Sequence, residues 1–235
     1  NLWLALIIAV IASIVLAFLT GLIAVRLSEA YFVIITAIFF SIFYLLSLSM
    51  SWLTGGDDGI SITVPSLSFG FTELSLYNPL VNYYFAFFFL VISSLILTRV
   101  VGSPLGKVFI SIRENSERTK FLGYNVFRYK LIAFILAGLF AGLSGALYAI
   151  RLRYGSADFF SFDWSVFPIV WVLIGGMGTL IGPCIGVVIM SLFQYYVSAW
   201  WTQYLIIVGV LIIVILRVSP KGIVGYIRSR RGEVK

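Results

Sequence analysis

The sequence has no histidine, a single cysteine and few charged residues, and each shortage excludes a class of protein. Without histidine the chain lacks the commonest general base and the commonest metal ligand, so we expect neither catalytic residues nor a metal site. The lone Cys184 cannot form an internal disulfide, and its apolar surroundings favour a packing role. Charged residues make up 11% of the chain, against about 25% in soluble domains, so a soluble fold is excluded.

What the chain has in abundance is apolar length. Hydrophobic residues make up 61% of the sequence and the mean hydropathy is +1.09. This composition predicts an all-α polytopic membrane protein, with residues 1–235 forming a single transmembrane domain in a lipid bilayer. The net charge of +7 does not indicate nucleic-acid binding, because the basic residues cluster beside apolar runs, as they do at membrane faces.

The apolar runs predict about seven transmembrane helices. Four runs are clear, at 2–25, 30–53, 80–98 and 131–150. The uncharged stretch 165–216 fits three more crossings, separated by breaks at 175–179 and 200–203. The chain begins without methionine and is apolar from Leu2, with no signal-peptide pattern, so we expect that an N-terminal portion is missing.

Charge between the runs predicts the orientation, because lysine and arginine concentrate in short cytoplasmic loops. The loop 99–130 and the tail 217–235 are rich in both and are placed in the cytoplasm. The loop 54–78 carries Asp57, Asp58 and Glu73 with no basic residue, which places it outside. Arg151 and Arg153, in the loop 151–164, are the exception to this pattern.

The loop 99–130 is the longest polar segment, and its interior predicts a short surface helix. Ser111 and Glu114 have the spacing of a capping box, and Gly123 is a natural stop. Two pairs of opposite charge have i,i+4 spacing and each contributes about 0.2–0.5 kcal/mol, which shapes a helix without holding it. These pairs are Arg113 with Glu117 and Glu114 with Arg118.

The same helix has apolar residues that require a partner surface, namely Ile110, Ile112, Phe121 and Leu122. Two interpretations remain for the segment. It is either a solvated connector with snorkelling basic ends or a docking helix for a cytoplasmic protein, and we favour the second.

The run 131–150 has small residues at steps of four, three and four: Gly138, Gly142, Gly145 and Ala149. This spacing puts them on one helical face, where a second helix backbone can approach closely. We interpret the stripe as a packing surface rather than as a substrate site.

No predicted span carries an ionisable residue at its centre, which argues against a proton-coupled carrier. A sodium-coupled carrier that uses backbone carbonyls at broken helices stays open. The segment 102–108 differs from a phosphate-binding loop, because three residues rather than four separate its glycines and Val108 stands where Ser or Thr is required. The pattern therefore fits a permease driven by a separate ATPase.

Glu117-Arg118-Thr119 followed by Gly123 resembles the EAA-x-x-x-G coupling motif of the membrane subunits of bacterial and archaeal ABC importers. Longer strings closely resemble the LivM-type permeases of branched-chain amino acid importers. They are GKVFISIRENSERTKFLGYNVFRYKLIAFILAGLFAGLSGALYA, VLIGGMGTLIGP and SPKGIVGYI, with RLSEAYFVIITAIFF and TGGDDG upstream. The chain departs from the motif at Arg118 and Thr119, where two alanines are typical, so Glu117 and Gly123 are the surer match.

The resemblance implies an ABC importer permease fold in the plasma membrane of a bacterium or archaeon. It also implies four partners: two ATP-binding subunits, a similar second permease and an external solute-binding protein. ATP and Mg²⁺ would bind the ATPase partners, and this chain would bind no cofactor. The residues expected at the ATPase contact are Arg113, Glu114, Glu117, Arg118 and Gly123.

A zwitterionic substrate can be met without a buried charge by hydroxyls and by backbone at broken helices. The candidates are Thr36, Thr54, Gly55, Gly56, Gly175, Gly176 and Gly178. For the glycines, turns and close packing are the stronger interpretation. Asp57 and Asp58 either contact the solute-binding protein or are simply solvated.

Three alternatives to a branched-chain amino acid permease stay in view. A permease for urea or short amides would share nearly all of these motifs. A self-contained carrier would need no ATPase. A membrane-embedded enzyme would need a cluster of catalytic polar residues, and the sequence offers none.

Overall fold

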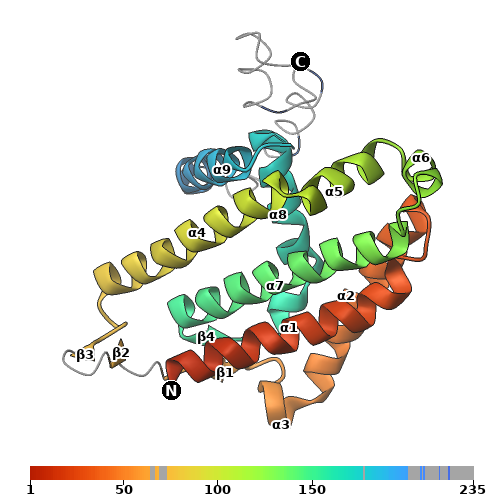
Figure 1. Cartoon of the computed structure of the whole chain (residues 1–235). Coiled ribbons are helices and arrows are strands. Elements are labelled where there is room, and N and C mark those ends of the chain that lie inside the picture. The colour runs from red at the N-terminus through yellow and green to blue at the C-terminus, as the bar shows by residue number, and fades with distance from the viewer. Residues whose placement is uncertain are drawn as a thin grey trace. The chain divides into compact units, whose positions relative to one another are not determined.

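The computed structural model describes residues 1–63, 67–68, 73–176 and 178–200, together with Ile207, Gly209, Arg217 and Gly222. The chain divides into two compact units, Asn1–Ser161 and Phe162–Lys235, and each is described by itself (Figure 1). Most of the described residues are helical, as the apolar runs predict.

The first unit holds four long helices, with a helix pair between the last two. The long helices are α1 (Leu2–Ala24), α2 (Glu29–Ser49), α4 (Pro79–Gly102) and α7 (Val126–Leu152). The short helices are α3 (Ser51–Thr54), α5 (Pro104–Glu114), α6 (Ser116–Phe121) and the 3-10 turn η1 (Ala157–Phe160). Two antiparallel pairs of very short strands complete it: β1 (Ile60–Ser61) with β4 (Tyr154–Gly155), and β2 (Leu67–Ser68) with β3 (Glu73–Leu74).

The second unit begins with α8 (Phe162–Gly175) and α9 (Ile181–Trp200). Among the described residues, five helices are long and apolar enough to cross a membrane: α1, α2, α4, α7 and α9. The four clear runs are therefore confirmed as helices. By contrast α8 has 14 residues, fewer than the roughly 20 that span a bilayer. The predicted break at 200–203 and the crossing after it fall almost wholly outside the described residues.

The helices α1 and α7 lie side by side (Figure 1). A Cβ added at Gly138 would clash with the Cβ of Ala17, and one added at Gly142 would clash with the side chain of Ser13. A Cβ at Gly145 would meet no atom of the described residues within 4 Å. The predicted packing stripe is thus confirmed against α1 at Gly138 and Gly142, and at Gly145, which α1 does not reach, it stays a prediction.

Candidate functional site

The segment between α4 and α7 folds as two helices, α5 and α6, rather than as the single helix predicted. Asn115 separates them with an extended backbone, φ −158° and ψ 102°. Each helix has its own N-cap: the Ser103 hydroxyl accepts a hydrogen bond from the Gly106 amide (3.4 Å), and the Asn115 side chain accepts one from the Arg118 amide (2.8 Å). These caps explain why the backbone restarts at Asn115.

The predicted capping box is therefore wrong. Ser111 lies in the last turn of α5, and the residue that caps the second helix is Asn115. The predicted charge pairs are wrong as helix pairs for the same reason, because the break at Asn115 separates the two members of each pair and removes their i,i+4 geometry. Their four side chains are exposed: Arg113, Glu114, Glu117 and Arg118.

A hydrogen bond between two hydroxyls, rather than an ion pair, joins α5 to α6. Thr119 is 1% exposed, its Oγ1 donates to the Asn115 carbonyl (2.9 Å), and it lies 2.8 Å from the Ser111 Oγ. Because the single Thr119 proton is given to Asn115, the Ser111 hydroxyl donates to Thr119. Thr119 departs from the alanine typical of the resembling motif, and here its hydroxyl fastens α6 onto α5.

The end of α6 presents two large apolar side chains to the surroundings. Phe121 is 90% exposed and Leu122 is 69% exposed, whereas Ile112 at the base of the pair is buried. Gly123 follows with φ +88°, and its amide donates to the Lys120 carbonyl (3.0 Å), so the predicted stop at Gly123 is confirmed. Phe121 and Leu122 form a protruding tip, and the partner surface predicted for it stays a prediction.

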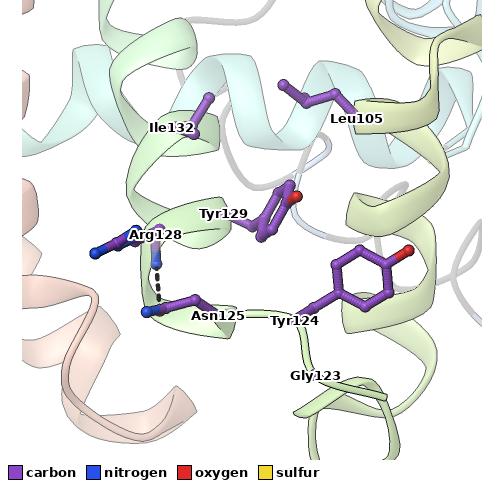
Figure 2. Close-up of a pocket in the computed structure, with 7 residues that line it drawn as sticks. All are labelled: Leu105, Gly123, Tyr124, Asn125, Arg128, Tyr129 and Ile132. Atoms are coloured by element: carbon purple, nitrogen blue, oxygen red, sulfur yellow. Dashed lines mark hydrogen bonds between the residues drawn. The ribbon is translucent and has the colours of Figure 1, made fainter.

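A shallow cavity of about 410 Å³ lies beside the turn that joins Gly123 to α7 (Figure 2). The rings of Tyr124 and Tyr129 meet edge to face across it, with centroids 5.8 Å apart. The Asn125 side chain caps α7 by accepting a hydrogen bond from the Arg128 amide (3.2 Å), while the Arg128 side chain points away from the rings (Figure 2). The entry into α7 is thus set by a cap and a ring contact.

The opposite end of α7 carries an arrangement that charge counting did not find. Arg153 follows α7 with φ +57°, and its Nη2 donates to the Tyr77 carbonyl (3.2 Å). Its guanidinium carbon also lies 4.2 Å from the centroid of the Tyr77 ring. The Arg153 carbonyl accepts from the Ile62 amide (2.9 Å), and the Tyr154 hydroxyl donates to the Asp58 carbonyl (2.7 Å). We call these contacts of Arg153 and Tyr154 the Arg153 clamp.

The substrate-path candidates of the first unit are engaged with their own backbone. The Thr36 hydroxyl donates to the Phe32 and Val33 carbonyls of α2, both at 2.9 Å. The Thr54 Oγ1 lies within donating distance of the Ser47 carbonyl (2.5 Å) and the Met50 carbonyl (3.0 Å), and it accepts from the Gly56 amide (3.2 Å) in the turn after α3. Thr36 lies near the start of α2, whereas Thr54 lies against Ser47 near its end, and 11 residues of helix, about 16 Å at 1.5 Å per residue, separate Thr36 from Ser47.

The glycines of the same turn have left-handed backbones, with φ +73° at Gly55 and +61° at Gly56. Their conformation gives both glycines a structural explanation. A substrate role for these four positions, Thr36, Thr54, Gly55 and Gly56, stays a prediction.

The candidates of the second unit surround the predicted break, which is confirmed between α8 and α9. Gly176 has φ +118° and Gly178 has φ +108°. A Cβ at Gly175 would clash with the Gly182 carbonyl, so α8 and α9 approach at backbone distance there. The Thr179 hydroxyl accepts a hydrogen bond from the Gly182 amide (3.0 Å) at the start of α9. Close packing and turns therefore explain Gly175, Gly176 and Gly178, and their substrate role stays a prediction.

Together, the apolar helices and the polar helix pair between two of them indicate a polytopic membrane protein. A family model described as "Branched-chain amino acid transport system / permease component" matches residues 1–216. The chain belongs to this family.

Similar proteins carry a consistent description. The chain is 29% identical over 250 residues to the "High-affinity branched-chain amino acid transport system permease protein LivM" of Salmonella typhimurium, and 28% identical over 249 residues to that of Escherichia coli; each match covers 97% of this chain and 58% of the relative. It is 26% identical over 240 residues to the "Probable branched-chain amino acid transport permease protein LivM" of Methanocaldococcus jannaschii, covering 93% of this chain and 68% of the relative.

The chain thus spans less than three-fifths of the two bacterial relatives. No solved structure gives a significant match.

Proposed function

We propose that this chain forms the permease part of an ATP-driven ABC importer for branched-chain or related amino acids, and that α6 is its coupling helix. The observation that carries the proposal is the protruding tip. Phe121 and Leu122 are exposed at the end of a capped helix that lies between two membrane-spanning helices. Aromatic anchors surrounded by charged side chains are typical of protein-docking surfaces.

The charge of the loop supports a cytoplasmic docking site. Four exposed charged residues flank the tip, namely Arg113, Glu114, Glu117 and Arg118, and the basic residues of 99–130 favour the cytoplasmic face. In this proposal two ATP-binding subunits hold ATP and Mg²⁺ and receive α6. A second permease subunit and an external solute-binding protein complete the importer in the plasma membrane of a bacterium or archaeon.

The substrate class rests on the names of the relatives, which describe branched-chain amino acid transport. A permease for urea or short amides is the alternative within the same architecture. Purified companion solute-binding protein, titrated with leucine, isoleucine, valine, urea and acetamide, separates the two. Tight binding of urea or acetamide with no binding of the amino acids would contradict the amino acid assignment.

Copurification and transport test the importer itself. The tagged protein is purified gently from its native membrane, its companions are identified by mass spectrometry, and the assembly is reconstituted in proteoliposomes. The proposal predicts recovery of an ATPase and a second permease. It also predicts uptake that requires ATP on the side of the proteoliposome membrane that corresponds to the cytoplasm. Recovery of this chain alone, with uptake that needs no ATP, would favour a self-contained carrier.

A further inference from the structure

The Arg153 clamp contains an unusual backbone position. Arg153 is the only non-glycine residue with positive φ among the described residues. The residue after a helix in this conformation is usually glycine, because a Cβ is unfavourable there. A side chain kept in a disfavoured backbone state indicates a role for that side chain.

The Arg153 side chain joins the end of α7 to the start of α4. Tyr77, which receives both the hydrogen bond and the guanidinium contact, directly precedes Asn78, and the Asn78 side chain caps α4 by accepting from the Leu80 amide (3.0 Å). The adjacent Leu76 is 1% exposed and packs in a cluster with Leu2, Leu6 and Ile150. The clamp therefore holds a firmly seated connection rather than a loose loop.

The backbone around Arg153 holds a second stretch of the same face. The Ile62 amide donates to the Arg153 carbonyl, and β1 pairs with β4 directly after it. The Tyr154 hydroxyl adds a bond to Asp58. The turn Gly55–Ile62 and the Tyr77 connection are thus both attached to the two residues that directly follow α7.

At their other ends, α4 and α7 are joined through α5 and α6 (Figure 1). The 27 residues of α7 span about 40 Å. The four helices α4, α5, α6 and α7 form a connected frame, and each has a side-chain cap at its N-terminus. The capping residues are Asn78, Ser103, Asn115 and Asn125. The frame thus connects α6 to the clamp continuously through α7.

We propose that Arg153 is a positioning residue that couples movement of α6 to the loops on the opposite side of the membrane. This inference rests on the proposed function, in which ATPase closure moves α6. Without the Arg153 side chain, α7 still moves, but the Tyr77 connection no longer follows it. ATP hydrolysis then continues while transport per ATP falls.

The test compares four variants of the assembled transporter. Arg153→Gly suits the left-handed backbone and removes only the side chain, so a folding defect is not expected. Arg153→Lys keeps the charge but loses the planar fork. Tyr77→Leu removes the ring and keeps the carbonyl. Arg151→Ala is the matched control, because Arg151 is an exposed arginine in the last turn of α7 whose side chain makes no hydrogen bond, ion pair or ring contact with the described residues.

Amide hydrogen exchange of the protein in nanodiscs tests whether the clamp stabilises the Tyr77 connection, and it does not depend on transport. Arg153→Gly should speed amide exchange at Tyr77 and Asn78, while Arg151→Ala leaves it unchanged. Exchange that is the same in Arg153→Gly and wild type would overturn the clamp, whatever the protein transports.

Uptake and ATPase rates in proteoliposomes read the coupling. We expect Arg153→Gly to lower uptake about fivefold or more with the ATPase rate within about twofold of wild type. Arg153→Lys should recover only part of the uptake, and Tyr77→Leu combined with Arg153→Gly should be no worse than Arg153→Gly alone.

Two patterns among the variants would overturn the coupling role. One is uptake and ATPase activity falling together, and the other is Arg151→Ala behaving like Arg153→Gly. A wild-type assembly without ATP-dependent uptake would refute the proposed function and the coupling role together. This outcome differs from failure of the coupling role alone, because uptake would then be absent from the wild type and from every variant.

Discussion

The two ends of α7 are held by different chemistry. At the α6 end, caps and one pair of hydroxyls fix the backbone, and the charged and apolar side chains of α6 are left exposed. At the other end, the side chains of Arg153 and Tyr154 are themselves the fastening, bonded to carbonyls of Tyr77 and Asp58. One end leaves its side chains exposed, whereas the other uses them for contacts within the chain.

The largest effect should come from reversing a charge at the α6 end. Because Glu117 is exposed, we expect Glu117→Lys to leave the fold and membrane insertion intact. It should reduce ATP-dependent uptake by more than about thirtyfold, because it places the wrong charge at the proposed ATPase contact. Uptake into proteoliposomes measures this. Asp158→Lys, an exposed acid beyond the other end of α7, serves as the control. Unchanged uptake in Glu117→Lys would remove the docking assignment.

Truncating the tip should weaken the assembly. Phe121→Ala removes a side chain that is 90% exposed in this chain, so the unfolding temperature should not change. Loss of an aromatic anchor at an interface costs about 2 kcal/mol, which is roughly a thirtyfold loss of affinity for the ATPase. Copurified ATPase per permease measures it.

Trp52, 79% exposed in α3, provides the matched control. Trp52→Ala should retain the full ATPase content. Equal retention in the Phe121 and Trp52 variants would mean that the tip is an ordinary lipid-facing surface.

The contact of α7 with α1 can be tested at the packing stripe of small residues on α7. Gly142→Ala places a Cβ against the Ser13 side chain and should destabilise the protein by about 1–3 kcal/mol. Gly145→Ala, on the same helix with nothing within 4 Å, should be neutral or stabilising by up to about 1 kcal/mol. Thermal unfolding in detergent compares them, and equal shifts would argue against the α1–α7 contact.

The smallest effect should come from the hydroxyl pair. Thr119→Val keeps the shape and leaves the Ser111 hydroxyl without its partner, at a cost of about 1–2 kcal/mol. Hydrogen exchange should rise in α6 and not at the Arg153 clamp. Thr119→Ser, which restores the hydroxyl, should recover most of the protection; failure to do so would assign the effect to packing instead.

Sequence patterns predicted this molecule best where one rule decided the outcome. Apolar length located the four clear helices, and helical spacing of small residues located the contact of Gly138 and Gly142 with α1. The same spacing did not show that α1 stops short of Gly145, because a stripe shows which face is small but not how far along it a neighbouring helix extends.

The α5–α6 break was missed for a related reason. Local pair rules favoured Ser111 as a cap, while the cap that formed was Asn115, four residues later. Both residue types cap well, so cap preference alone does not decide between the two positions. The Thr119–Ser111 contact joins residues eight positions apart across the break, and such a contact leaves no periodic signal.

Arg153 illustrates the remaining limit. Charge counting placed Arg153 as an exception on the side where arginine is uncommon, but it could not find its partner Tyr77, which is 76 residues away in the sequence. An arginine on the disfavoured side was nevertheless the available signal. A charged residue that departs from the membrane charge pattern thus indicates a contact within the protein.

The most direct test of the central claim is photocrosslinking from the α6 tip in the native membrane. A benzophenone amino acid replaces Phe121 in one sample and Trp52 in another, and the crosslinked products are identified by mass spectrometry. The account predicts an adduct between position 121 and an ATP-binding subunit and no such adduct from position 52. Adducts from position 121 to lipid alone, or an ATPase adduct from position 52 and not from 121, would contradict it.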